Sequence, residues 1–171
     1  GGLTRTSINI YPAIGQARGI AVQGFAARAV FIEDFDPSLP RVLGNHDALV
    51  QILLNLIKNA VEAAPPGAAP QIRLSTGFRH GLSWDAGDGH GPQPLPVEIA
   101  VSDNGPGIPE ALADNLFDPF VSGNPDGQGL GLALVDKLVR DMGGIVQHDR
   151  RQSWTRFRLH LPVAGTLAVE Q

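Results

Sequence analysis

One stretch, residues 44–67, most constrains how this chain can fold. Its sequence is GNHDALVQILLNLIKNAVEAAPPG, and its apolar residues recur with the period of an α-helix. Asn45 or Asp47 can cap the start of the helix, and Pro65-Pro66-Gly67 ends it. The stretch therefore predicts a helix of about 16 to 18 residues with well-marked ends and enough apolar residues for the core.

The polar residues of this helix fall on one stripe: Gln51, Asn55, Lys58, Asn59 and Glu62. A solvated stripe is usually built from Glu, Lys, Gln and Arg. Asn disfavours a helix by roughly half a kcal/mol relative to Ala. Two asparagines four residues apart on one face therefore indicate a function beyond solubility.

The remaining patterns predict an α/β sandwich with a mixed, mostly antiparallel sheet and helices packed on one face. The apolar rhythm predicts further helices at 8–25, 108–117 and 129–144. Alternation and branched residues predict strands at 28–35, 70–78 and 96–104, and a closing hairpin at 145–150 and 154–161.

Residues 79–95 are rich in Gly and Pro and lack periodicity, so they predict a long, flexible surface loop between two strands. The loop holds four possible metal ligands: His80, Asp85, Asp88 and His90. Their spacing repeats no ligand pattern, which favours a solvated loop over a metal site.

Composition narrows the classes of protein further. The 171 residues suit one domain, 1–171, and the net charge of −4 shows no nucleic-acid footprint, since no basic run exceeds Arg150-Arg151. The absence of cysteine excludes disulfides and thiolate metal sites and fits a reducing cytoplasm. No membrane segment or signal peptide is expected. The chain begins Gly1-Gly2 without Met, from which we expect a piece of a longer protein.

Two glycine clusters lie at turns. DNGPGIP, residues 103–109, follows a strand and precedes a helix, so it could be a simple tight turn or could let a ligand approach the backbone. Asp103 ends the apolar strand, and an ionised carboxylate there would accept from a donor such as an exocyclic amino group.

The second cluster, DGQGLGL at 126–132, opens a helix, where free N–H groups and the helix dipole favour a phosphate. It is neither a P-loop nor a dinucleotide fingerprint, and a flexible loop is the alternative.

Taken in order, four motifs resemble the GHKL ATP-binding family over residues 31–162. They are the asparagine-bearing helix, DNGPGIP, LFDPFVS at 116–122 and DGQGLGL, similar to the N, G1, F and G2 boxes. DFDPSLP at 34–40, DNGPGIP and LFDPFVSG most resemble nitrogen-regulation sensor histidine kinases of the NtrB type. The resemblance implies the GHKL fold and an ATP site with Mg²⁺.

The resemblance also assigns roles. Asn59 would be the Mg²⁺ ligand, Asn55 would support the metal and phosphates, Lys58 would reach a phosphate, and Asp103 would accept from the adenine amino group. The residues that would shape the base pocket are Gly105, Gly107 and Ile108. Those that would hold the phosphates are Gly127, Gly129, Leu130, Gly131 and Leu132.

A short lid at 121–128, with hinge ends at Gly123 and Gly127, would cover the nucleotide. Phe117 and Phe120 would anchor it or would be core aromatics without ligand contact.

The family's ATP-hydrolysing members carry a glutamate where this chain has Asn55, so efficient hydrolysis is not expected. The family's phosphate-accepting histidine sits in a His-Glu-x-x-Asn/His-Pro context, which none of the five histidines has. For His46 a solvent-facing position at the helix start is the expected reading.

We therefore expect a catalytic ATP-binding half without catalytic residues beyond the support of Asn55 and Asn59. Its phosphoacceptor histidine would lie on a dimerisation domain absent from the chain. The implied partners are that domain, an NtrC-like response regulator and a PII signal protein. A stand-alone serine kinase of the anti-sigma-factor type and a nucleotide-sensing module without transfer activity are the alternatives.

Overall fold

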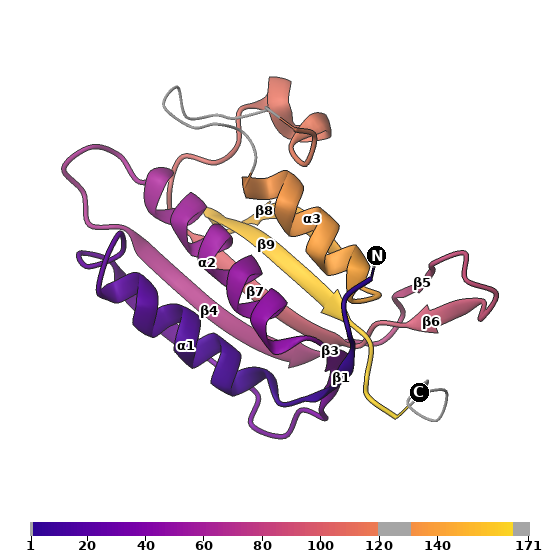
Figure 1. Ribbon diagram of the computed structural model, residues 1–171. Coiled ribbons are helices and arrows are strands. Elements are labelled where there is room, and N and C mark those ends of the chain that lie inside the picture. The colour runs from indigo at the N-terminus through magenta and orange to yellow at the C-terminus, as the bar shows by residue number, and fades with distance from the viewer. Residues whose placement is uncertain (1, 120–130, 166–171) are drawn as a thin grey trace.

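The computed structural model describes residues 2–119 and 131–165. A five-stranded mixed sheet forms its centre (Figure 1). In spatial order, the strands are β2 (Val30–Asp34), β4 (Gln71–Phe78), β7 (Val97–Asp103), β9 (Trp154–Leu161) and β8 (Ile145–Arg151). β2 runs parallel to β4, and the other neighbours are antiparallel.

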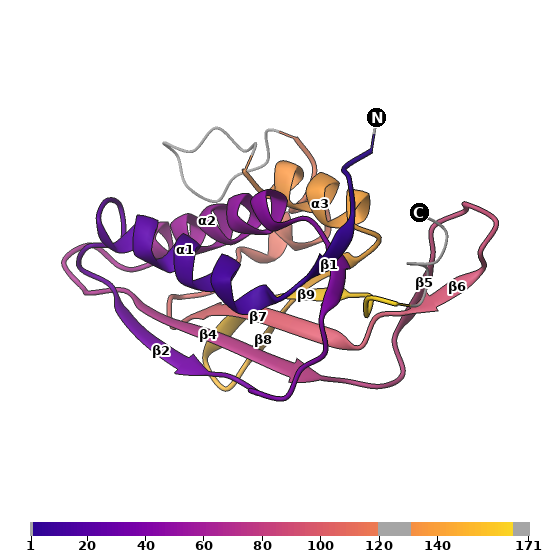
Figure 2. The same ribbon diagram turned by 60° about the horizontal axis from the view of Figure 1, so that its bottom comes forward.

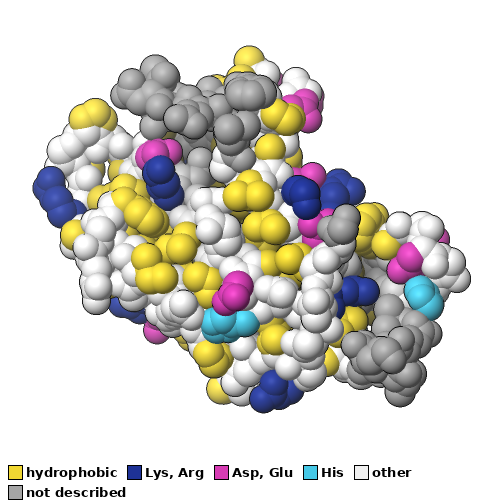
Figure 3. Space-filling model, in the orientation of Figure 1, with side chains coloured by type: hydrophobic (Ala, Val, Ile, Leu, Met, Phe, Trp, Pro, Cys, Tyr) yellow, Lys and Arg dark blue, Asp and Glu magenta, His cyan; other side chains and the backbone are white. Residues whose placement is uncertain are grey.

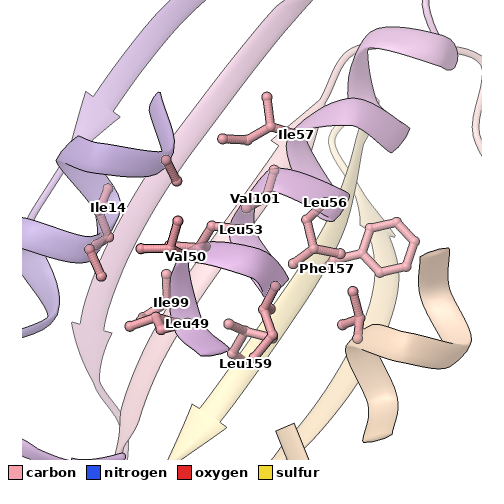
Figure 4. Close-up of a cluster of buried hydrophobic side chains, with 14 of the residues drawn as sticks. Ile14, Leu49, Val50, Leu53, Leu56, Ile57, Ile99, Val101, Phe157 and Leu159 are labelled. Atoms are coloured by element: carbon pink, nitrogen blue, oxygen red, sulfur yellow. The ribbon is translucent and has the colours of Figure 1, made fainter. Parts of the chain in front are cut away.

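Three helices, α1 (Ile10–Val22), α2 (His46–Glu62) and α3 (Gly131–Asp141), cover one face of this sheet (Figure 2). In the described ranges, the opposite face carries no helix. The core lies between the two layers. Leu53 and Leu56 of α2 meet Val101 of β7 and Phe157 of β9 there (Figure 4). The predicted sandwich with helices on one face is therefore confirmed.

The predicted ends of the central helix are confirmed at Asn45. Its backbone is extended, and its side-chain oxygen accepts from the Ala48 N–H at 2.9 Å. The amide nitrogen of the same side chain donates to the Thr4 carbonyl at 2.9 Å. One side chain thus caps α2 and fixes the N-terminal segment beside it.

Short elements differ from the sequence prediction. β1 (Thr6–Ile8) and β3 (Val42–Gly44) form a two-stranded antiparallel sheet that was not predicted, since three residues carry too little alternation to be recognised. The helix predicted at 108–117 is a 3₁₀ helix, η1 (Glu110–Asn115), with no buried residue to hold a longer helix against the core.

The Gly- and Pro-rich insert 79–95 also contains more structure than the predicted loop. β5 (Ser83–Asp85) and β6 (Pro92–Pro94) pair as a short antiparallel hairpin at the far right of Figure 1. Gly87, Gly89 and Gly91 have positive φ, so the tip between the strands turns where only glycine is unstrained.

Within the described ranges, no helix is both long and apolar enough to cross a membrane. In the same ranges, no three side chains among His, Asp and Glu gather into a group that could hold a metal ion, the insert residues His80, Asp85, Asp88 and His90 included.

Candidate functional site

The predicted site residues come from elements that meet at one end of the sandwich. The C-terminal end of α2, the end of β7, η1 and the start of α3 lie at the same end of the sheet in both ribbon views (Figures 1 and 2). The hairpin β5–β6 lies at the opposite end. Sequence positions as distant as 59, 103 and 131 are therefore neighbouring parts of one region.

On α2, Asn55 and Asn59 are both half-buried, and Lys58 is exposed. The two asparagines lie one turn apart and so share a face of the helix. The Asn55 side-chain oxygen accepts from Gln51 Nε2 at 3.3 Å. The helix thus presents two amides at the edge of the core, with the exposed ammonium group of Lys58 beside them.

Asp103 is the last residue of β7 and is only 4% exposed. Burial raises the pKa of its carboxyl group, opposed by the Gly105 N–H, which donates to Oδ1 at 2.9 Å, and by the positive charge of Arg150. Within residues 2–119 and 131–165, the Gly105 N–H is the donor that reaches this buried carboxylate, which is therefore suited to a polar ligand group that can donate.

The turn after Asp103 needs glycine at two positions. A Cβ on Gly105 would lie 2.6 Å from the carbonyl oxygen of Ala63, the C-cap residue of α2. Gly107 has φ +95°, and a Cβ there would lie 2.7 Å from Arg150 Nη1. The glycines therefore allow a tight turn and also the close packing of that turn against α2. Ile108 follows, half-buried against the core.

Two residues of this region were missed by the sequence analysis. Arg150 Nη1 donates to the Gly105 carbonyl at 3.0 Å and to Thr155 Oγ1 at 2.8 Å. Thr155 is buried and pairs with Asp103 across β7 and β9. The antiparallel register brings these residues together. The sequence indicates this only through the alternation of the last strand, which puts Thr155 on the same face as the apolar Phe157 and Leu159.

Phe117 follows η1 and packs on the sheet. Its ring centroid lies 6.2 Å from that of Phe157 and 5.9 Å from that of His148. The Nε2 atom of His148 is hydrogen-bonded to the Ala113 carbonyl at 3.1 Å. Phe117 therefore anchors the η1 segment to β8 and β9, which agrees with its reading as a core aromatic. Phe120 lies outside the described residues.

The second glycine cluster is described only in part. Gly131 begins α3 and is exposed, and Leu132 is half-buried against the core. Gly127, Gly129, Leu130 and the lid predicted at 121–128 lie outside the described residues, so their roles stay predictions.

The sequence and fold were compared with those of known proteins. Residues 44–165 match the family model described as "Histidine kinase-, DNA gyrase B-, and HSP90-like ATPase". The chain is 47% identical over 161 residues to the sensory histidine kinase/phosphatase NtrB of Azospirillum brasilense, with 94% of this chain and 40% of the relative covered. It thus spans about two fifths of the length of that curated relative.

Two solved structures share the fold. The catalytic domain of histidine kinase ThkA, free of nucleotide, superposes with a TM-score of 0.72 at 26% identity, over 94% of this chain and 96% of that one. ThkA in complex with the response regulator TrrA gives 0.69 at 24% identity, over 92% and 41%. Since the family model covers well over half of the sequence, the chain belongs to the histidine kinase-, DNA gyrase B- and HSP90-like ATPase family.

Proposed function

We propose that this chain is the ATP-binding catalytic domain of a cytoplasmic two-component sensor histidine kinase of the NtrB type. It would bind Mg-ATP and transfer the γ-phosphoryl group to a histidine on a dimerisation domain outside these residues. The observation that carries the proposal is the packing of the Asp103–Gly107 turn against the end of α2, because it brings a buried carboxylate next to the asparagine-bearing helix.

The donor set fits a magnesium ion held through a nucleotide. Mg²⁺ takes hard oxygen ligands, keeps several waters and needs only one or two protein ligands. Asn59 would hold it through its amide oxygen, with Asn55 one turn away in support. When bound, the ion would neutralise phosphate charge during transfer.

Asp103 would select the base. Its carboxylate would accept from an exocyclic amino group, while the Gly105 N–H holds Oδ1 in place. Lys58, exposed on α2, would reach a phosphate as a point charge. Gly131 and Leu132 at the start of α3 would belong to the phosphate side of the site, with Gly127, Gly129 and Leu130 before them.

The position of Asn55 supports transfer over hydrolysis. An amide offers no basic lone pair with which to activate water, and the half-buried Asn55 already accepts a hydrogen bond from Gln51. Phosphoryl transfer needs positioning and charge neutralisation more than acid–base chemistry from the protein. The domain would therefore hold ATP for an acceptor brought to it.

The chain's own histidines are poor candidates for that acceptor. His46 is hydrogen-bonded to Gln16, His148 to the Ala113 carbonyl, and His160 is buried. His80 and His90 belong to the insert at the other end of the sheet. The acceptor would thus be a histidine of the dimerisation domain. The resemblance extends the proposal to an NtrC-like response regulator as the next phosphate acceptor and to a PII-type protein as a regulator.

Calorimetry with Mg-ATP tests the site. Asn59→Ala should abolish measurable binding and leave the fold intact, because Ala is the better helix former. Gln16→Ala is the control: it removes an exposed amide of α1 together with its hydrogen bond to His46, at the end of α2 away from Asn59, and should bind as the unaltered chain does. Unchanged affinity in Asn59→Ala would refute the metal assignment.

Transfer is tested with γ-labelled ATP and the histidine-bearing helical domain of the parent protein. The chain alone should not become labelled, whereas the mixture should label the added domain on histidine. Label on the chain itself, or acid-stable label on a serine of another protein, would refute the proposal that this domain transfers phosphate to a histidine on a separate domain.

A further inference from the structure

The helix-free face of the sheet carries an unusual concentration of arginine. On the helix-covered face, Lys and Arg side chains stand in small separate groups (Figure 3). On the other face, alternate residues of β9 place Arg156, Arg158 and His160 away from the core residues Phe157 and Leu159. They line a hollow of about 480 Å³ together with Arg79, Arg151 and Glu98.

Positive charge prevails in this hollow. Glu98, 5% exposed, pairs with Arg158 Nη1 at 3.2 Å and with Arg79 Nε at 3.8 Å. Asp149 on β8 accepts from Arg156 at 2.7 Å and 2.8 Å and lies 3.1 Å from Arg158 Nη2. Among the described residues, four lining arginines thus face two carboxylates, an excess of two positive charges at a concave surface.

Two buried polar atoms at the hollow lack partners. In the described part of the chain, neither Arg158 Nε nor His160 Nε2 has a hydrogen-bond partner, although His160 is only 3% exposed. Buried polar groups in folded proteins are nearly always paired, because an unpaired one forfeits its hydration without replacement. Both residues line the hollow, so the unpaired groups lie in its wall, directly beside any group bound there.

The base of the insert forms one wall of the hollow. His80, Gly81 and Leu82 line it beside Arg79. The Arg79 N–H donates to the Pro96 carbonyl at 2.7 Å, and the Leu95 N–H donates to the Leu82 carbonyl at 2.9 Å. These bonds fix the two ends of the insert next to β7, so the wall is part of the folded structure.

We propose that this hollow is a second ligand site, which binds a small oxyanion through a phosphate or carboxylate group. Guanidinium groups match both groups with paired N–H donors, and the volume suits a small molecule. Glu98 precedes Asp103 by five positions on β7, roughly 16 Å, and points to the other face of the sheet. The site is therefore separate from the proposed nucleotide site.

The test is an NMR titration of the ¹⁵N-labelled chain with inorganic phosphate and, separately, succinate, against sodium chloride at equal ionic strength. We expect saturable shifts of the Arg158 Nε–H and His160 ring signals with at least one probe, and none with chloride. They should persist when a non-hydrolysable ATP analogue is present. Shifts that vanish with the analogue, or no saturable shift with either probe, would overturn the proposal.

Matched variants remove the same charge inside and outside the hollow. Arg79→Gln removes a rim arginine whose side chain is 65% exposed, so the fold should tolerate it. Arg28→Gln removes an exposed arginine from the turn before β2. Loss of one charge-assisted contact should weaken anion binding about tenfold in Arg79→Gln. If Arg28→Gln weakened anion binding equally, the effect would come from the net charge of the chain, and the site would be refuted.

Discussion

Gly105 is tightly packed at the turn of the proposed nucleotide site. Gly105→Ala should lower the free energy of unfolding by about 1–3 kcal/mol, because its Cβ would press on the Ala63 carbonyl oxygen at 2.6 Å. Gly15→Ala is the control: it lies within α1 with no atom in the way and should stabilise by about 0.5–1 kcal/mol. Urea unfolding measures both, and equal effects would contradict the close packing.

A substitution of Asp103 should affect the stability of the fold and the affinity for ATP in different ways. Burial raises its pKa, so its favourable contribution to stability is present below the unfolded-state pKa and is lost as pH rises through the raised folded-state value. Asp103→Asn should therefore leave stability at neutral pH unchanged or higher, while ATP affinity falls several-fold as an acceptor becomes a donor. Urea unfolding at pH 7 and calorimetry are the measurements, and undiminished affinity would remove Asp103 from the base pocket.

The strands β8 and β9 should respond to mild acid through His160. Burial lowers the pKa of His160, and the positive charge of Arg158 lowers it further. The negative charge of Glu98, which also pairs with Arg79, acts in the opposite direction. A depressed imidazole pKa stabilises the fold above 6.5, and this contribution is lost as pH falls below that value. His160→Gln should flatten the dependence of unfolding free energy on pH in this range. An unaltered slope would show that other groups govern it.

Elements with several agreeing signals were predictable from the sequence, and elements defined by distant partners were not. For α2, periodicity predicted a helix, Asn45 or Asp47 its start and Pro65-Pro66-Gly67 its end, and the observed helix His46–Glu62 fits between them. The hairpin within 79–95 and the β1–β3 pair are short, and their strands are defined by pairing. In the candidate site, Asn59, Asp103 and Gly105 were predicted from local motifs, and their roles in binding stay predictions. Arg150 and Thr155 required the register of β7 with β9.

Across the whole molecule, the insert and the proposed nucleotide site lie at opposite ends of the sheet (Figure 1). Replacing residues 84–93 by a short Gly-Ser linker should therefore leave Mg-ATP affinity within about twofold, since no described contact of the site depends on the hairpin. Stability should fall modestly, because Arg140 stacks on Trp84 at 5.6 Å. Calorimetry on the replaced chain decides, and loss of ATP binding would show coupling along the sheet.

The order of the strands also bears on how the chain folds. β8 and β9 join through the tight turn at Gln152 and Ser153, both of which have positive φ, so their pairing closes a very short loop. In the central pair β7–β9, Asp103 pairs with Thr155, and in β2–β4, Val30 pairs with Gln71. Because these partners are far apart in the sequence, both pairings close long loops at a larger entropic cost. We expect the C-terminal hairpin to form before the rest of the sheet docks on it. A variant that weakens this turn should then slow refolding in stopped-flow more than it speeds unfolding.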